Sequence, residues 1–284
     1  MFIDRSAPRE QNLGVFRFLN TSLSAWKDSF MIKAIIFDID NTLYDYDSAN
    51  ADAMKALEKY TYDNLGWDKA ETRTRIKTAY SRIQNEIGQK AAIHNRLIRF
   101  QRVLEANGLP LHPYALEMHN LYWDTLIDSA RVFDGVDKAL AQLKNAGFVL
   151  GIGTNMTADI QFQKLTRFGL LQYFDFIVSS EEADCEKPDK NLFLKCAIKA
   201  GYDPSSCLYV GDSLIHDIVA ADDAGFQVLW FRPGKTQLEE GAALPVDHNE
   251  YVYTGGDSYP SFSDFNLLPS IIEKLISDPQ ESDQ

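Results

Sequence analysis

Short apolar runs alternate along the chain with longer stretches in which apolar residues recur at helical spacing. The runs that predict buried strands cover residues 32–37, 148–152, 176–178, 208–210 and 228–231. The helical stretches between them end at glycines such as Gly147 and Gly201, and glycine readily adopts the left-handed conformation that closes a helix. Strands and helices that alternate in this way are typical of an α/β fold, a Rossmann-like parallel sheet wrapped by helices.

The stretch between the first and second predicted strands interrupts this alternation. Residues 45–133 contain several helical patterns but no strand-like run, and they are too many for a single crossover helix. We therefore predict an all-helical domain inserted into the α/β core, with its clearest breaks at residues 64–66 and 108–110. A further helix is predicted over residues 268–276, near the end of the chain.

The two ends of the chain are set apart from the predicted core of residues 31–44 and 134–276. Residues 1–30 are slightly basic and carry an apolar stripe that would lie on one helical face, formed by Phe16, Leu19, Leu23, Trp26 and Phe30. We interpret this N-terminal extension as a docked or frayed appendage. An organelle-targeting peptide stays open, whereas polar residues interrupt the apolar part that a secretory signal needs. Residues 277–284 are predicted to form a polar tail.

The composition narrows the class of protein without deciding its function. Of the 284 residues, 45% are hydrophobic and 24% are charged, which is typical of a soluble globular protein. No apolar run approaches the ~20 residues that cross a bilayer, and the net charge of −13 disfavours nucleic acid and anionic membranes as partners. The three cysteines lack the paired spacing of a zinc site, which favours reduced thiols and a cytoplasmic location. The oligomeric state stays open.

Two carboxylates, Asp38 and Asp40, directly follow the first predicted strand. Ligands of open α/β sheets bind at the carboxyl ends of the strands, and alternate residues of an extended chain point to the same side. Both carboxylates can therefore face one small site. A turn followed by a helix cap is the alternative interpretation of this run.

Three polar residues follow later in the chain at comparable positions. Thr154 and Asn155 come directly after the second predicted strand, and Lys187 lies at the entrance of a later helix. A hydroxyl and a helix N-terminus can donate hydrogen bonds to an anion, and a lysine places a positive charge beside a phosphate. Each feature also has an ordinary interpretation, as an N-cap or as a simple helix entrance.

Two more carboxylates, Asp212 and Asp217, follow the fourth predicted strand. Taken alone, they are compatible with helix capping. Several carboxylates at one sheet edge repel one another unless a cation is present, and oxygen ligands without His or Cys suit a hard divalent ion. The sequence therefore predicts a Mg²⁺ site at this edge.

In chain order, these features resemble the four motifs of the haloacid dehalogenase superfamily, which read D-x-D-x-T, S/T, K-P and G-D-S-x-x-x-D. The resemblance covers residues 31–232 and implies that residues 45–133 form the superfamily's helical cap of the first type. Because Asp40 supplies the second carboxylate, it implies a phosphatase of small-molecule phosphomonoesters. Asn41 stands where Gly is frequent, but Asn tolerates unusual turn dihedrals. Met156, which follows the second motif, is expected to bear on substrate choice.

The resemblance also implies a mechanism. Asp38 would attack phosphorus to form an aspartyl-phosphate, and Asp40 would act first as general acid and then as general base. The ligands of Mg²⁺ would be Asp38, the backbone carbonyl of Asp40, and Asp212. The residues that bind phosphate would be Thr154, Asn155 and Lys187. Asp217 would orient Lys187 or a metal-bound water.

Substrate choice would depend on the inserted helices. Residues 90–102 contain His94, Arg96 and Arg99 and no acid. At 100° per residue, Arg96 lies nearer the apolar face than Arg99, so Arg96 is the first candidate for substrate contact and His94 the second. A solvated basic face is the alternative. This run is similar to nucleotidase-like members, which suggests a nucleoside monophosphate.

Two other functions stay open at this stage. The same core supports a phosphosugar mutase if the closed cap excludes water. The apolar stripe of the N-terminal extension would also suit a non-catalytic binding protein with a fold of this superfamily. The four intact motifs favour an enzyme over that second alternative.

Overall fold

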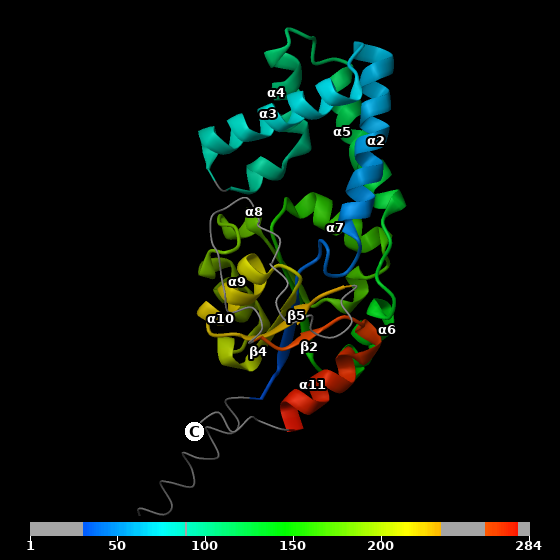
Figure 1. Ribbon diagram of the computed structural model, residues 1–284. Coiled ribbons are helices and arrows are strands. Elements are labelled where there is room, and N and C mark those ends of the chain that lie inside the picture. The colour runs from blue at the N-terminus through cyan, green and yellow to red at the C-terminus, as the bar shows by residue number, and fades with distance from the viewer. Residues whose placement is uncertain (1–30, 89, 234–258, 278–284) are drawn as a thin grey trace, which may run out of the picture.

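Six strands form one parallel sheet, and the five predicted runs make up five of them (Figure 1). The computed structural model describes residues 31–88, 90–233 and 259–277. The strands are β1 (Ala34–Phe37), β2 (Val149–Thr154), β3 (Phe176–Ser179), β4 (Cys207–Gly211), β5 (Gln227–Phe231) and β6 (Ser261–Phe262). Their order is β3-β2-β1-β4-β5-β6, and every neighbouring pair is parallel. The predicted fold class is confirmed.

The sequence patterns do not predict the short edge strand β6, which lies in a segment near the end of the chain without a clear pattern. Ser261 and Phe262 pair with Trp230 and Phe231 of β5. Two residues are too few to show an alternation of period two. The ring of Phe262 packs against those of Phe231 and Phe265, so tertiary contacts rather than local pattern place this strand.

Helices cover both faces of the sheet. In the α/β part they are α6 (Val136–Asn145), α7 (Ala158–Arg167), α8 (Ser180–Ala183), α9 (Lys190–Ala200), α10 (Ala220–Asp223) and α11 (Leu268–Ser277). The shorter helical segments there are Leu171–Tyr173, Pro204–Ser206, Leu214–Val219 and Phe265–Leu267. Ile35 and Phe37 of β1 share an apolar cluster with α6, α7 and α11, whereas Ala34 and Ile36 share one with α9 and α10. Burial on both faces explains the continuous apolar strands, and α11 confirms the helix predicted near the end of the chain.

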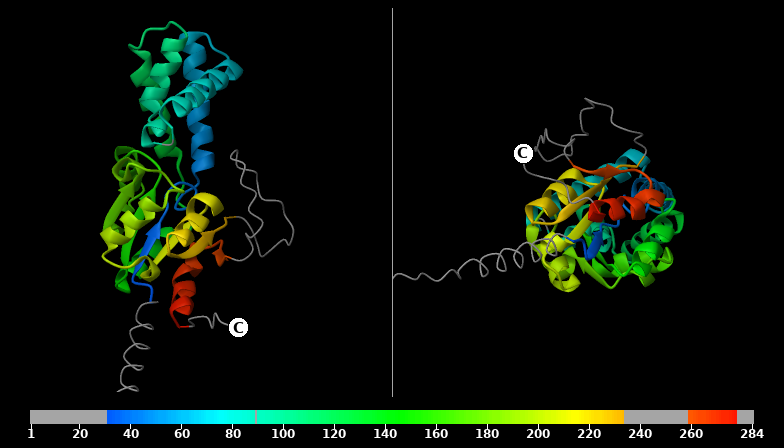
Figure 2. Two further views of the ribbon diagram at one scale, coloured as in Figure 1. Left: turned by 90° about the vertical axis from the view of Figure 1, so that its left-hand side faces the viewer. Right: turned by 90° about the horizontal axis from the view of Figure 1, so that it is seen from below.

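Four helices from the predicted insertion lie together beyond the carboxyl end of β1 (Figures 1 and 2). This helical group consists of α2 (Tyr46–Leu65), α3 (Lys69–Ile87), α4 (Arg96–Ala106) and α5 (Tyr114–Ser129), with the 3-10 turn η1 (Ala91–His94). Gly66 ends α2 with a φ of 70°, at one of the predicted breaks. Apolar residues of the group, such as Leu57 and Met118, join the same buried cluster as Phe37 of the sheet.

Parts of the predicted organisation lie outside the described residues. These are the N-terminal extension of residues 1–30 with its apolar stripe, residues 234–258 of the predicted core, and the polar tail from residue 278. Among the helices of the described ranges, none combines the length and the apolar character that a bilayer-spanning segment requires.

Candidate active site

Three carboxylates converge at the carboxyl edge of the sheet. Asp38 follows β1 and Asp212 follows β4, and these two strands are neighbours in register, with Phe37 opposite Val210. One oxygen each from Asp38, Asp212 and Asp217 lies within 4.8 Å of the others. The parallel register therefore brings together residues that are far apart in the sequence.

Asp217 is held in place by the turn that follows β4. The backbone N–H of Ser213 donates a hydrogen bond of 3.0 Å to its Oδ2. Gly211 lies directly against this carboxyl group, since a Cβ at that position would come within 2.5 Å of the Asp217 side chain. A side chain at position 211 would displace Asp217, so the glycine is required by this close approach.

Lys187 bridges two of these carboxylates. Its Nζ lies 2.7 Å from Oδ1 of Asp38 and 2.6 Å from Oδ1 of Asp217, and the residue is only 5% exposed. Asn155 holds the lysine backbone, because its amide nitrogen donates to the Lys187 carbonyl and its amide oxygen accepts from the Lys187 N–H. The predicted phosphate contact of Asn155 would therefore come from its backbone rather than from its side chain.

The electrostatics of this cluster show an excess of negative charge. Burial raises the pKa of Asp38 to about 7, against the lowering effect of Lys187, and Asp217 raises it further. Burial together with Asp217 and Asp38 raises the pKa of Asp212 well above its usual range. Burial alone would lower the pKa of Lys187, but Asp217 and Asp38 raise it. One lysine does not balance three carboxylates, and a divalent cation at these oxygens would favour their ionised form.

Asp40 has different neighbours from Asp38. Its Oδ1 lies 2.6 Å from Nζ of Lys164 and accepts a 2.6 Å hydrogen bond from the Tyr44 hydroxyl. The amide of Gln161 approaches its Oδ2 at 3.5 Å. Burial would raise the pKa of Asp40, but Lys164, Tyr44 and Gln161 lower it. In this arrangement, Asp40 is ionised and lies outside the carboxylate cluster.

Sequence reasoning missed Lys164 and Gln161, although both are fully buried on α7. Gln161 also donates to the Thr154 hydroxyl at 2.8 Å, so it joins two predicted site residues. A signal existed in the sequence, because these polar residues flank the apolar positions Ile160 and Leu165 on the buried face of α7. Polar residues on an apolar helix face are candidates for a site.

Two hydroxyls and one unusual turn complete this edge. The buried Thr154 accepts from Gln161, which leaves its own hydrogen to donate to a ligand. Thr42 donates to Oδ1 of Asp212 at 3.2 Å. Asn41 has a φ of 59°, and its side chain accepts from the Asp47 N–H. The expectation that Asn tolerates an unusual dihedral at this turn is confirmed.

The helical group brings Arg96 and His94 to its boundary with the core. Arg96 donates to the hydroxyls of Tyr46 and Tyr122, at 3.3 and 3.1 Å. Burial would lower its pKa, but Tyr122 and Tyr46 raise it. His94 reaches the core instead, where its Nε2 lies 2.9 Å from Oε1 of Glu186, the residue before Lys187. The structure therefore gives both candidates protein partners near the site.

Comparison with known proteins identifies the family. The sequence model of one protein family, "Haloacid dehalogenase-like hydrolase", matches residues 35–231, which is most of the chain. The chain belongs to this family. The match includes both predicted carboxylate motifs and the helical group, and the resemblance read from the four motifs is confirmed.

Several curated relatives are named as phosphatases. The chain is 31% identical to "Ribulose-1,5-bisphosphate 5-phosphatase" of Halopiger xanaduensis, over 80% of this chain and 98% of that protein. It is 32% identical to "Glyceraldehyde 3-phosphate phosphatase" of Methanopyrus kandleri, over 73% of this chain and 87% of that protein. It is 25% identical to "Pyrimidine 5'-nucleotidase PynA" of Streptococcus pneumoniae, over 78% of this chain and 92% of that protein.

Solved structures show the same fold. The crystal structure of "2-Haloacid Dehalogenase from Pseudomonas syringae pv. Tomato DC3000" aligns with a TM-score of 0.64 at 26% identity, over 86% of this chain and 99% of that one. The HAD-hydrolase YfnB from Bacillus subtilis, in a crystal form bound to magnesium, aligns with a TM-score of 0.60 at 22% identity, over 86% and 99%.

Proposed function

We propose that this protein is a Mg²⁺-dependent phosphatase that hydrolyses a small-molecule phosphomonoester through an aspartyl-phosphate on Asp38. The observation that carries the proposal is the convergence of Asp38, Asp212 and Lys187 at one sheet edge. Family membership supports it, because curated relatives covering most of the chain are named as phosphatases. The presence of Asp40 two residues after the nucleophile favours phosphate esters over haloacids, as the resemblance implies.

In this mechanism, Asp38 and Asp40, which follow β1, have different roles. A carboxylate oxygen of Asp38 attacks phosphorus, and the ester oxygen leaves as an alcohol after Asp40 protonates it. Water then attacks phosphorus while Asp40 removes a proton from that water, and the bond between phosphorus and Asp38 breaks to release inorganic phosphate and the free Asp38 carboxylate. Asp40 is ionised beside Lys164 in the absence of substrate. A bound phosphate dianion would raise the pKa of Asp40. The higher pKa would favour the protonated carboxyl group, which the first step needs.

The residues around the phosphate divide into donors and metal ligands. The Lys187 ammonium and the Thr154 hydroxyl would hold the non-bridging oxygens, and backbone N–H groups near Asn155 would add donors. Asp38, Asp212 and the backbone carbonyl of Asp40 would hold Mg²⁺, and the oxygen-only donor set fits this ion. When bound, the ion supplies positive charge that offsets repulsion between the nucleophile and the phosphoryl group. Both oxygens of Asp217 already accept hydrogen bonds, which supports its predicted role in orienting Lys187.

The helical group would serve as the cap over this site. Its position beyond the carboxyl end of β1 suits a domain that excludes water during phosphoryl transfer (Figure 1). The substrate class is a small phosphorylated metabolite. Two relatives are named for sugar phosphates at 31% and 32% identity and one for nucleotides at 25%, so we favour a sugar phosphate over the nucleoside monophosphate suggested by the sequence. We place the enzyme in the cytoplasm, with no nucleic-acid or membrane partner.

The experiment that tests this proposal measures phosphate release from a panel of sugar phosphates, nucleoside monophosphates and phosphoglycolate. We expect hydrolysis that EDTA abolishes and Mg²⁺ restores, and a loss of at least ~10³-fold in Asp38→Asn. Product analysis separates hydrolysis from mutase chemistry, because a mutase yields an isomer and no free phosphate. Full activity in Asp38→Asn, or hydrolysis that is insensitive to EDTA, would contradict the proposal.

A further inference from the structure

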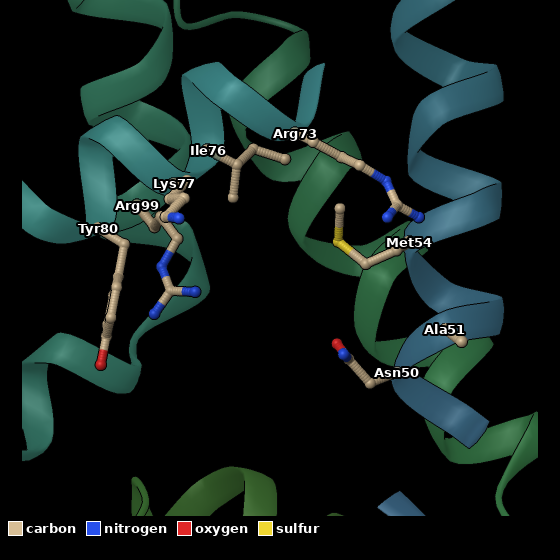
Figure 3. A pocket seen from close by; sticks show the side chains of 8 residues that line it. All are labelled: Asn50, Ala51, Met54, Arg73, Ile76, Lys77, Tyr80 and Arg99. Carbon is tan, nitrogen blue, oxygen red and sulfur yellow. The ribbon is translucent and has the colours of Figure 1, made fainter. Parts of the chain in front are cut away.

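The helical group contains a pocket of about 320 Å³ that the sequence analysis does not predict. Its walls come from α2, α3 and α4 (Figure 3). The residues that line it are Asn50, Ala51, Met54, Arg73, Ile76, Lys77, Tyr80 and Arg99. Three of these side chains are cationic, and none is acidic. A cavity with this lining is suited to an anion attached to a small organic group.

The cations of this pocket differ in whether an acid already neutralises them. Arg73 forms an ion pair with Glu58, which lies on the neighbouring helix α2. Lys77 and Arg99 have no carboxylate within ion-pair distance in the part of the chain that the structure describes. Two positive charges are therefore left for a ligand. Lys77 is exposed, whereas Arg99 is buried.

Arg99 is the decisive residue of the pocket. It is 8% exposed, its Nη2 donates to the Ile93 carbonyl at 2.9 Å, and its guanidinium lies 4.2 Å above the ring of Tyr80 (Figure 3). Its buried Nε has no hydrogen-bond partner among the described residues. Burial and the nearby Arg96 lower the pKa of Arg99 to about 9. A buried guanidinium with an unused donor and no acid nearby is costly unless an anion binds it.

The sequence pattern placed Arg99 farther from the apolar face than Arg96, and this expectation is wrong. Arg99 is the more buried of the two. The periodicity of α4 alone contains no information on neighbouring helices, and Tyr80 of α3 covers the side of α4 from which Arg99 projects. The alternative of a solvated basic face is therefore wrong at this position.

Polar contacts connect the pocket with the catalytic edge. Asn50 lines the pocket and accepts a 2.6 Å hydrogen bond from the Tyr122 hydroxyl, which in turn accepts from Arg96. Arg96 also donates to Tyr46, whose ring lies 5.7 Å from Nζ of Lys164. Lys164 in turn pairs with the proposed acid and base, Asp40. The pocket and the reaction centre thus lie at two ends of one polar cluster.

We propose that this pocket binds a second phosphate group of the substrate, held by Arg99 and Lys77, while the reacting phosphate lies at Asp38. The physiological substrate is then a bisphosphate of a small metabolite. This inference rests on the proposed phosphatase function and adds the substrate class to it. A second phosphate supplies the negative charge that the two unpaired cations lack, and guanidinium and ammonium donors suit its oxygens.

The test compares substrates that differ only by the second phosphate. The pairs are ribulose 1,5-bisphosphate with ribulose 5-phosphate, fructose 1,6-bisphosphate with fructose 6-phosphate, and adenosine 3',5'-bisphosphate with adenosine 5'-monophosphate. We expect kcat/KM to favour the bisphosphate by at least about tenfold in one pair. In Lys77→Met and Arg99→Gln that ratio should fall about fivefold or more, chiefly through KM. The control is Arg82→Met, which removes an exposed charge from the same helix outside the pocket and should keep the ratio.

The outcomes separate this inference from the function on which it rests. Lys77 is exposed, so its variant remains informative if Arg99→Gln fails to fold. Hydrolysis of the monophosphates without a preference for any bisphosphate overturns the second-phosphate site alone. So does a ratio that both pocket variants leave unchanged, or that Arg82→Met lowers equally. If the wild-type protein hydrolyses no ester of any pair in the presence of Mg²⁺, both proposals fail.

Discussion

The carboxyl edge of the sheet and the pocket between α2, α3 and α4 are both lined by charged side chains, but the buried lysines of the edge contact carboxylates, whereas the buried arginine of the pocket does not. At the edge, Lys187 contacts Asp38 and Asp217, and Lys164 contacts Asp40, all within 2.7 Å. In the pocket, the buried Arg99 has no acid partner among the residues that the structure describes. The lysines of the edge are therefore positioned without substrate, whereas Arg99 would gain an anionic partner only from the ligand that we propose. Under the proposed function, the residues at the strand ends would carry out the reaction and the helical group would select the substrate.

At the sheet edge itself, the two carboxylates of one short turn, Asp38 and Asp40, also differ in their neighbours. Burial raises the pKa of Asp38 to about 7 against the lowering effect of Lys187, and the charge of Asp217 adds to the rise. Asp40 is only half-buried, and Lys164 and Tyr44 bind it directly and lower its pKa. Neighbours from other elements therefore assign different roles to two residues of one motif.

Among the substitutions that test this comparison, Lys187→Met is expected to have the largest effect on activity. The change removes the cation from the edge, so we expect kcat/KM to fall about 10²–10³-fold for every substrate, because the loss concerns the reacting phosphate. The measurement is steady-state hydrolysis of several esters. Lys190→Met, an exposed position three residues later, is the matched control. If the fall in kcat/KM differs among the esters, Lys187 contributes to substrate selection, and the proposed division of roles between the sheet edge and the helical group is incorrect.

The second prediction concerns the stability that the edge gains from pairing. Lys164→Met leaves Asp40 without its cation, and we expect the free energy of unfolding at pH 7 to fall by about 2–3 kcal/mol. Because the folded pKa of Asp40 is lowered, the pair stabilises the fold above the unfolded pKa of 3.8, and this contribution is lost as the pH falls through the lower folded pKa. The difference between variant and wild type should therefore shrink in acid. Chemical denaturation at several pH values measures it.

A double variant controls that stability prediction. Asp40→Asn combined with Lys164→Met removes both charges, and we expect it to recover part of the lost stability. If the double variant is less stable than Lys164→Met by the full effect of Asp40→Asn, the two residues act independently and the pairing account is incorrect.

The third prediction concerns Mg²⁺ binding and pH. Below pH 7 the metal-free Asp38 is protonated, so a proton must leave when the cation binds. The dissociation constant for Mg²⁺ should therefore rise about fivefold between pH 7 and pH 6 and change less above pH 7. Isothermal titration calorimetry in buffers of different ionisation enthalpy measures both the affinity and the released proton. An affinity that is constant between pH 6 and pH 8 would exclude this linkage.

The smallest effect is expected in the helical group. Arg96→Met should lower kcat/KM about fivefold to tenfold, by an amount that varies among substrates, and should leave the affinity for Mg²⁺ unchanged. Hydrolysis of the same ester panel measures it. Arg102→Met, an exposed arginine of the same helix, is the control. If kcat/KM falls equally for every ester, Arg96 contributes to the chemical step rather than to substrate selection.

The sequence predicts most of the fold, because long-range packing and local pattern agree there. Five strands follow from short apolar runs and the helix over 268–276 from helical spacing, and the parallel arrangement of the strands follows from their alternation with helices. β6 does not, since two residues carry no period and their pairing depends on contacts with β5. Aromatic packing around Phe262 stabilises that pairing.

The site divides in the same way. Residues that follow strands were predictable, because the carboxyl ends of parallel strands meet at one edge. Lys164 and Gln161 enter this edge from the side of α7, and Arg99 is buried by a different helix, so their roles depend on contacts between elements. Periodicity within one helix does not contain that information. The amide of Asn155 likewise contacts the Lys187 backbone, a partner that no local pattern indicates.

The central claim is that Asp38 becomes phosphorylated during turnover. Its most direct test is acid quenching of the enzyme during hydrolysis with Mg²⁺, followed by borohydride reduction and peptide mass spectrometry, because reduction converts an aspartyl-phosphate into homoserine. We predict homoserine at position 38, only when substrate and Mg²⁺ are both present, and none in Asp38→Asn. Sustained hydrolysis in which Asp38 is never modified would contradict the account.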